Sequence, residues 1–173
     1  MHRWHWLIVM LGFGCVAGTA SAATGRAALA PTQPDSTVSG TVVVTDTDAG
    51  LHIVAEILNA PPGQHGFHIH EFGACDQAGA AAGSHYNPAG VSHGDVLRDG
   101  LAHAHAGDFG NMEVSAEGRA TLDLVVPQLT VSGSAHPVAG RAVILHAQPD
   151  DFGQPTGNAG GRIACGPILI TGP

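Results

Sequence analysis

Hydrophobic and polar residues alternate along several short stretches of the chain. The clearest stretch is 51–58, where Leu51, Ile53, Ala55 and Ile57 place an apolar side chain at every second position. This period is typical of a strand that buries one face. Gly and Pro residues at turns separate the stretches. The pattern predicts strands over residues 38–45, 51–58, 66–71, 111–114, 120–126, 141–146 and 162–170.

Two longer segments lack this alternation. Residues 72–106 are rich in Gly, Ala, His and Asp without a regular apolar period, and the irregular residues 147–161 separate the last two predicted strands. A structureless segment as long as the first is functional or disordered in most compact domains. The sequence therefore predicts an all-β fold, an antiparallel barrel or sandwich of about eight strands with two long functional loops.

The N-terminal residues resemble an export signal. Arg3 supplies a positive charge, residues 7–16 form an apolar run, and residues 20–22 form a small-residue cleavage site. We therefore expect residues 1–22 to be a signal peptide and the protein to be periplasmic or secreted. The apolar run is too short for a membrane span. A lipid anchor at Cys15 is the alternative, although a Gly stands three residues before it in place of a bulky aliphatic residue.

The remaining residues divide into a short leader and one domain. Residues 23–36 are rich in Ala, Thr and Pro without periodicity, which predicts a flexible leader. Residues 37–173 are then the domain, of a size that fits a single hydrophobic core. The 14 Asp and Glu outnumber the 6 basic residues, all Arg, and the net charge of -8 argues against nucleic acid as a partner.

Cleavage of the signal would remove Cys15 and leave two cysteines, Cys75 and Cys165. An even count in an oxidising compartment indicates a disulfide, and two buried free thiols are the alternative. The bond would close a loop of about 90 residues. Loop-closure entropy gives such a bond roughly 4 kcal/mol before strain is subtracted.

The 12 His residues are the most unusual feature of the composition, since histidine is the commonest metal ligand among side chains. His68 and His70 lie one residue apart in a predicted strand, so both imidazoles project to the same side. Two polar residues on a solvent-facing strand are the alternative interpretation of this pair. The first long loop and the strand before the second supply the other candidates: His85, His93, His105, Asp108 and His146.

Imidazoles with one carboxylate suit zinc or copper, whereas calcium and magnesium prefer oxygen ligands. Two metal ions with four ligands each need eight ligand positions, and the chain offers seven candidates. Two adjacent ions would therefore have to share one imidazole, with a metal on each ring nitrogen.

The candidates stand in motifs that resemble copper/zinc superoxide dismutases of the exported, bacterial type. The resemblance covers nearly all of residues 37–170, with the motifs in the same order and at compatible spacings. It implies a Greek-key barrel. The motifs are Gly66-Phe67-His68-Ile69-His70-Glu71-Phe72-Gly73, Ser84-His85-Tyr86-Asn87-Pro88, Ser92-His93-Gly94, His105-Ala106-Gly107-Asp108-Phe109-Gly110-Asn111, Gly140-Arg141, His146 with Asp150-Asp151-Phe152-Gly153, and Gly157-Asn158-Ala159-Gly160-Gly161-Arg162-Ile163-Ala164-Cys165-Gly166.

The resemblance implies one copper and one zinc per subunit. The implied copper ligands are His68, His70, His85 and His146. The implied zinc ligands are His85, His93, His105 and Asp108, with His85 as the shared imidazole. Asp150 matches a carboxylate that joins His68 to His93 and orients both rings. Taken alone, Asp150 in a Pro-Asp-Asp sequence would be interpreted as a turn residue.

Other residues take their expected roles from the same matching. Arg162 matches an arginine beside the copper that attracts the anionic substrate, and Cys75 and Cys165 match the disulfide of the family. His65 matches a structural histidine. His103 is not expected to be a ligand, because the motif that follows sets the register on His105.

The implied function is dismutation of superoxide to oxygen and hydrogen peroxide. Copper would be alternately reduced and reoxidised beside a structural zinc, His85 and Arg162 would be the catalytic residues, and the extracytoplasmic space would be protected from superoxide. Relatives are commonly homodimers. The segment between His146 and Arg162 is shorter than in animal members and lacks Lys, which places the attraction of substrate mainly on Arg162.

A periplasmic copper/zinc buffer or a copper-delivery protein on the same fold is the alternative function, because a fold does not fix an activity. Noncatalytic relatives usually lose ligands or the arginine. This chain keeps all seven implied ligands and Arg162, which favours the enzyme.

Overall fold

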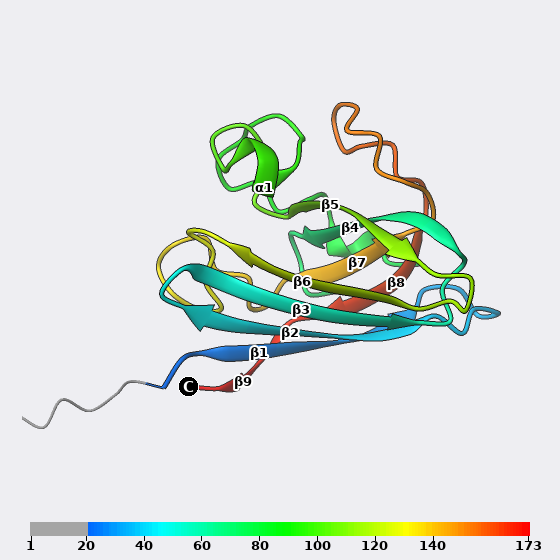
Figure 1. Ribbon diagram of the computed structural model, residues 1–173, viewed down its shortest axis with the longest axis horizontal. Helices are drawn as coiled ribbons and strands as arrows, with labels where there is room; N and C mark the ends of the chain where they lie inside the picture. Colours follow the sequence, from blue (N-terminus) through cyan, green and yellow to red (C-terminus); the bar gives the residue numbers. More distant parts are fainter. Residues whose placement is uncertain (1–20) are drawn as a thin grey trace, which may run out of the picture.

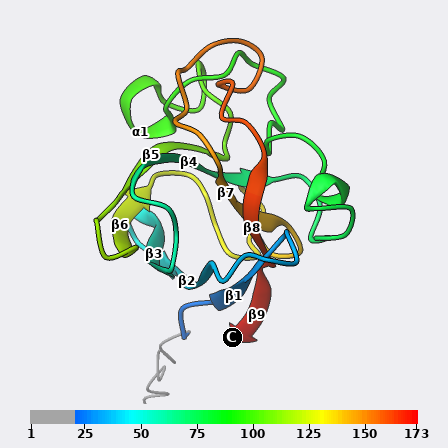
Figure 2. The same ribbon diagram turned by 90° about the vertical axis from the view of Figure 1, so that its right-hand side faces the viewer.

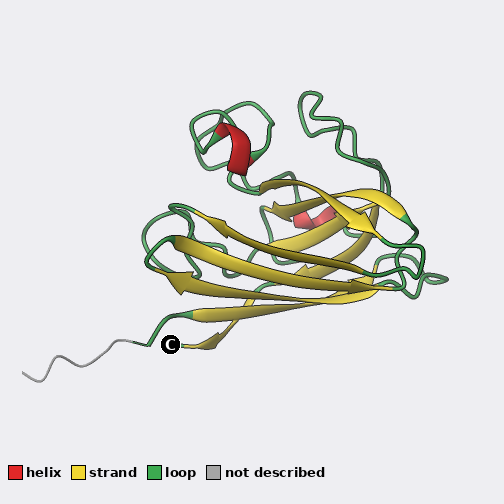
Figure 3. Ribbon diagram, in the orientation of Figure 1, coloured by secondary structure: helices red, strands yellow, loops and turns green. Residues whose placement is uncertain are grey.

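The computed structural model describes residues 21–173, and these form an antiparallel β-barrel with little helix (Figures 1 and 3). The elements are β1 (Thr24–Pro31), β2 (Ser39–Thr47), β3 (Gly50–Leu58), β4 (Gly63–His70), the 3-10 helix η1 (Ala80–Ala82), α1 (Val96–Asp99), β5 (Asp108–Val114), β6 (Ala120–Val126), β7 (Ala142–His146), β8 (Arg162–Pro167) and β9 (Leu169–Gly172).

The sheet has the strand order β5-β4-β7-β8-β1-β2-β3-β6, with β9 paired to β1. The two end strands, β5 and β6, lie next to each other, so the sheet curls into a nearly closed barrel. Around this barrel β4, β5 and β6 are neighbours and β7 returns to lie beside β4, which is a Greek key. The predicted all-β Greek-key fold is confirmed.

The barrel interior is filled by the inward side of each strand. Leu51, Ile53, Ala55 and Ile57 on β3 are all buried, as the alternation predicts. Each large aliphatic side chain buried in this way contributes roughly 1.5–3 kcal/mol to folding. The barrel is therefore stabilised chiefly by its interior, and its outer surface on β4 is free to carry polar residues.

The flexible leader predicted for residues 23–36 is wrong over most of its length. Residues 24–31 form β1, which pairs with β2 from Thr24 to Leu29. Gly25, Ala27 and Leu29 face inward and are buried. Two of the three inward residues are small, so they give too weak an apolar signal to predict a strand. The domain therefore starts at about residue 24.

The last predicted strand, residues 162–170, is divided into β8 and β9 at Ile168. The Ile168 amide donates to the carbonyl of Arg141, and its own carbonyl accepts from the amide of Gly140. The chain thereby leaves β7, because β8 pairs with β7 and with the end of β1, whereas β9 pairs with the start of β1.

The two long loops rise from the same side of the barrel, above β4, β5 and β7 (Figures 1 and 2). One is the segment between β4 and β5, which contains η1 and α1, and the other is the segment between β7 and β8, drawn in orange. We call them the first loop (71–107) and the second loop (147–161). Their shared side is where the predicted ligands gather.

The predicted signal peptide, with Cys15, lies almost wholly outside the described residues. Within residues 21–173, no helix has the length and apolar character needed to cross a membrane.

Candidate metal centre

Two residues of β4 supply the base of the site. Phe67 and Ile69 point into the barrel and belong to its core. The alternation of a strand therefore turns His68 and His70 to the opposite face, where the two loops cover them and both are almost fully buried. The His-x-His pair is thus not a solvent-facing pair, which excludes the alternative interpretation of the pattern.

The first loop reaches this face by pairing with the end of β4. The amide of Tyr86 donates to the carbonyl of Ile69 at 2.8 Å, and the amide of Glu71 donates to the carbonyl of Ser84 at 2.9 Å. These bonds place His85 directly across from His70. Gly107, at the end of the first loop, also packs against the end of β4, since a Cβ there would lie 2.1 Å from the Ile69 carbonyl oxygen. Only glycine allows so close an approach.

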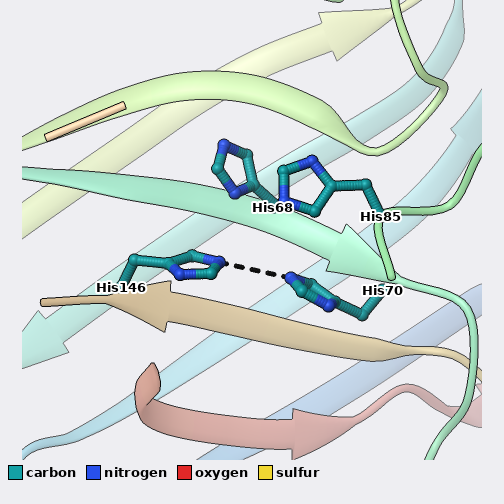
Figure 4. Close-up of side chains that lie close together, drawn as sticks. All are labelled: His68, His70, His85 and His146. Atoms are coloured by element: carbon teal, nitrogen blue, oxygen red, sulfur yellow. Dashed lines mark hydrogen bonds between the residues drawn. The ribbon is translucent and has the colours of Figure 1, made fainter. Parts of the chain in front are cut away.

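Four histidines form the first of two possible metal-binding groups. One ring nitrogen from each of the four lies within 4.8 Å of the others, and all four residues are buried. Figure 4 shows their rings turned toward one another from β4, β7 and the first loop. We call this the four-histidine group, and its members are His68, His70, His85 and His146.

Hydrogen bonds select which nitrogen of each imidazole is free. Carbonyl oxygens of the loops accept from Nδ1 of His70 (Gly83, 3.0 Å) and of His146 (Gly160, 3.3 Å). A carbonyl oxygen only accepts, so it holds the proton on that nitrogen and leaves Nε2 as the possible ligand. The two free Nε2 atoms lie 3.2 Å apart (Figure 4).

The second group is built around a carboxylate and shares His85 with the first. We call it the three-histidine group, and its members are His85, His93, His105 and Asp108. Nδ1 of His85, His93 and His105 lies 2.7, 2.8 and 3.1 Å from the Asp108 carboxylate. Three nitrogens and one oxygen make a ligand set suited to tetrahedral zinc.

Asp108 is fully buried, and a buried carboxylate needs partners. The amides of Gly94 and His105 both donate to its Oδ2 at 3.0 Å. Burial alone would raise the pKa of Asp108, but the neighbouring imidazoles of His105, His85 and His93 outweigh burial and hold the pKa far below its usual range. Asp108 is therefore an anion at neutral pH.

Asp150 of the second loop connects the two groups. Its carboxylate lies 2.8 Å from Nε2 of His68 and 3.0 Å from Nε2 of His93. Gly157 makes room for it, because a Cβ there would lie 1.9 Å from Oδ1 of Asp150. The structure thus places Asp150 between a member of each group, and both rings are left with Nδ1 facing inward.

These two inward atoms give a test of whether the residues fit metal ions. Within residues 21–173, Nδ1 of His68 and Nδ1 of His93 are the buried side-chain atoms without a hydrogen bond. His93 Nδ1 is close to Asp108, but the two do not meet hydrogen-bond geometry. Each group therefore holds one buried nitrogen lone pair that a metal ion would satisfy.

The pKa values agree with metal binding. Burial is the largest cause that lowers the pKa of His70 to about 2, of His85 to about 4 and of His146 to about 3. These imidazoles are therefore neutral at pH 7, which is the form that can bind a metal ion. Burial also lowers the pKa of His93, but Asp108 and Asp150 outweigh burial and raise it to about 9. The surroundings of His93 therefore favour a positive charge.

A pocket of about 360 Å³ opens onto the four-histidine group, and Arg162 lies in its wall with His70, His85 and His146. The Arg162 guanidinium donates to the carbonyls of Gly79 and Gly83. The Cys75–Cys165 disulfide ties that part of the first loop to β8. The predicted disulfide is confirmed, and it helps to hold the wall in which Arg162 sits.

A family model for copper/zinc superoxide dismutase (SODC) matches residues 38–168. The chain belongs to the copper/zinc superoxide dismutase family. The crystal structure of the clock protein EA4 is also similar, with 37% sequence identity and a TM-score of 0.74 over 89% of this chain and 98% of that chain. This member of the superoxide dismutase family thus resembles a protein named for a clock role, and family membership establishes the fold and the type of site rather than the activity.

Other histidines lie outside both groups. The ring of His65 is 2.8 Å from the carbonyl oxygens of His146 and Pro61, and His103 is exposed. Sequence reasoning assigned no role to Asn111 or Gln154, whose amides hold the main chain of Asp150 and of His93. No local pattern could reveal these contacts, because the partners are 39 and 61 residues apart.

Proposed function

We propose that the protein dismutates superoxide outside the cytoplasm, with copper in the four-histidine group and zinc in the three-histidine group. The observation that carries the proposal is the pair of buried Nδ1 atoms on His68 and His93, one in each group and both fixed by Asp150. Export is supported by the disulfide, which is stable in an oxidising compartment. A homodimer remains a prediction.

The reaction converts two superoxide ions and two protons into oxygen and hydrogen peroxide. When bound, copper would supply the one-electron redox couple, and zinc would supply a fixed positive charge without redox chemistry. His70 and His146 would present Nε2 to copper, because their Nδ1 protons are held by loop carbonyls.

His85 has the position to move a proton. Its Nδ1 lies 2.7 Å from Asp108, on the side of the three-histidine group. Its other nitrogen, Nε2, is left for the four-histidine group, where it can alternately hold a proton and release it to the product. If Nδ1 is the lone-pair ligand of the three-histidine group, a proton on Nε2 leaves the ring neutral, which is the form that burial favours at neutral pH.

Arg162 provides the positive charge that an anionic substrate needs. Arg162 lies in the pocket wall with His70, His85 and His146, so an anion that enters the pocket would meet its positive charge beside the four-histidine group. Burial lowers the pKa of Arg162, but a guanidinium keeps its proton in proteins at neutral pH, so the side chain is charged. Because the whole chain carries a net charge of -8, this local charge is needed to offset repulsion of the anion.

The proposal is tested by loading the purified protein with copper and zinc and measuring superoxide loss beside a zinc-only sample. We expect rapid turnover only with copper. His146→Ala should abolish turnover and copper binding while zinc binding is kept, and His103→Ala, at an exposed histidine, is the matched control. Arg162→Ala should slow turnover without removing copper. Full loading without turnover would overturn the proposal and favour a metal buffer.

A further inference from the structure

The second loop holds His93 at three places. Asp150, Phe152 and Gln154 come from a single short segment, at every second residue. The Asp150 carboxylate lies 3.0 Å from His93 Nε2, and the ring of Phe152 is stacked on the imidazole with centroids 6.4 Å apart and planes at 20°. The third contact, from Gln154, is made to the main chain.

The contact of Gln154 is reciprocal. The amide N–H of His93 donates to Oε1 of Gln154 at 3.0 Å, and Nε2 of Gln154 donates to the carbonyl of His93 at 2.9 Å. One side chain therefore satisfies both main-chain groups of His93, as a neighbouring strand would. Two bonds of this kind fix the position of the main chain and also its rotation.

Little else fixes the His93 main chain. The preceding residues of the first loop form a local turn, in which the Asn87 side chain bonds both main-chain groups of Val91. Both residues of this turn lie in the first loop, so these two bonds do not connect the first loop to the second loop. On the other side of His93, the amide of Gly94 donates to Asp108. Gln154 is thus the residue that ties the main chain of this possible ligand to the other loop.

We propose that Gln154 is a positioning residue for the three-histidine group. It acts on a bound zinc ion through His93. This inference rests on the proposed function, because it assumes that the group binds zinc. The Asp150 contact fixes the far nitrogen of the imidazole, and the Gln154 contact fixes the point where the side chain leaves the main chain. Together they aim Nδ1 at Asp108. Loss of Gln154 would keep the His93 imidazole but leave it less precisely oriented toward the zinc ion.

The test uses Gln154→Met, which keeps the length of the side chain and removes both hydrogen bonds. Gln148→Met is the matched control, because Gln148 lies in the same loop, is exposed and has no side-chain hydrogen bond among the residues described. The measurements are the zinc dissociation constant, the visible spectrum of Co²⁺ bound at the three-histidine group, copper affinity, and the thermal midpoint of the metal-free protein.

We expect Gln154→Met to weaken zinc binding roughly 10–100-fold, as loss of a residue that orients a ligand commonly does. The Co²⁺ spectrum should change, whereas copper affinity and the metal-free midpoint should match those of Gln148→Met. Zinc affinity and a spectrum equal to those of the control would overturn the inference. Equal weakening of both metals together with a lower metal-free midpoint would also overturn it, because the role would then be purely structural.

Failure of the inference and failure of the proposed function give different results. A wild-type protein that binds zinc but does not dismutate superoxide contradicts the function and leaves the zinc measurements on Gln154 valid. A wild-type protein that is active, with Gln154→Met unchanged in zinc binding, contradicts the inference alone.

Discussion

Strands β2, β3 and β6 and the two long loops are held together by different interactions. In the strands a continuous ladder joins Ser39–Thr47 to Gly50–Leu58 and then to Ala120–Val126, and the side chains below it are aliphatic. The loops have almost no ladder. Their contacts are a disulfide, buried imidazoles and carboxylates, and side-chain amides that bond to main-chain groups.

This difference has an energetic consequence. Aliphatic burial stabilises the strands whether or not a metal is present. In the loops, neighbouring imidazoles and the Asp108 carboxylate are packed where a cation would join them. The free energy of metal binding is therefore coupled to ordering of the loops, and the strands should be insensitive to it. Three experiments test this comparison.

Removal of both metals should give the largest effect. Structural zinc sites supply binding free energies of roughly 10–16 kcal/mol, much of which is spent on ordering the chain. We expect amide hydrogen exchange to become at least about tenfold faster in residues 72–106 and 147–161, with little change in β2, β3 and β6. Exchange mass spectrometry of the loaded and metal-free protein measures this. An equal loss of protection in strands and loops would contradict the comparison.

The same difference decides what could be predicted from the sequence. The alternation on β3 and β6 places these strands correctly, since a strand that buries one face must repeat every two residues. The limits of the long loops are also visible, because the apolar period stops there. Strand β1 was missed, since its inward residues Gly25, Ala27 and Leu29 are mostly small. Its pairing depends on β2, β8 and β9, which no local pattern reports.

The site shows a similar limit. Residue types alone indicate zinc or copper, and the shared imidazole follows from a count of candidates. The assignment of each histidine to a group came from the family resemblance, and the structure brings the same residues together. The contacts of Asn111 and Gln154 could not be predicted, because each is a tertiary contact of an amide with distant main chain.

A smaller effect is expected from a cavity in the barrel. Ile53 on β3 is 1% exposed, and Ile53→Ala removes three buried carbon atoms. We expect unfolding free energy to fall by about 2–5 kcal/mol, by the same amount with and without metals. Denaturant titration measures both values. Val54→Ala, at a neighbouring residue that is 39% exposed, is the control and should change stability by less than about 0.5 kcal/mol.

A loss in Ile53→Ala that depends on the metals would show that the strands and the metal groups form a single cooperative unit. The separation drawn between the two regions would then be wrong.

The smallest effect concerns a contact between the two regions. Asn111 on β5 donates from Nδ2 to the carbonyl of Asp150 at 2.9 Å and accepts the amide of Asp150 at 2.7 Å. Each bond contributes about 0.5–1.5 kcal/mol, so Asn111→Ala should cost roughly 1–3 kcal/mol of unfolding free energy. Asn158→Ala is the control, because the exposed Asn158 amide bonds only to the Asp151 side chain among the described residues. If the two variants are equally stable, Asn111 does not hold the second loop, and its order must come from the metals and from its other contacts, such as those of Asp150 and Gln154 with His93.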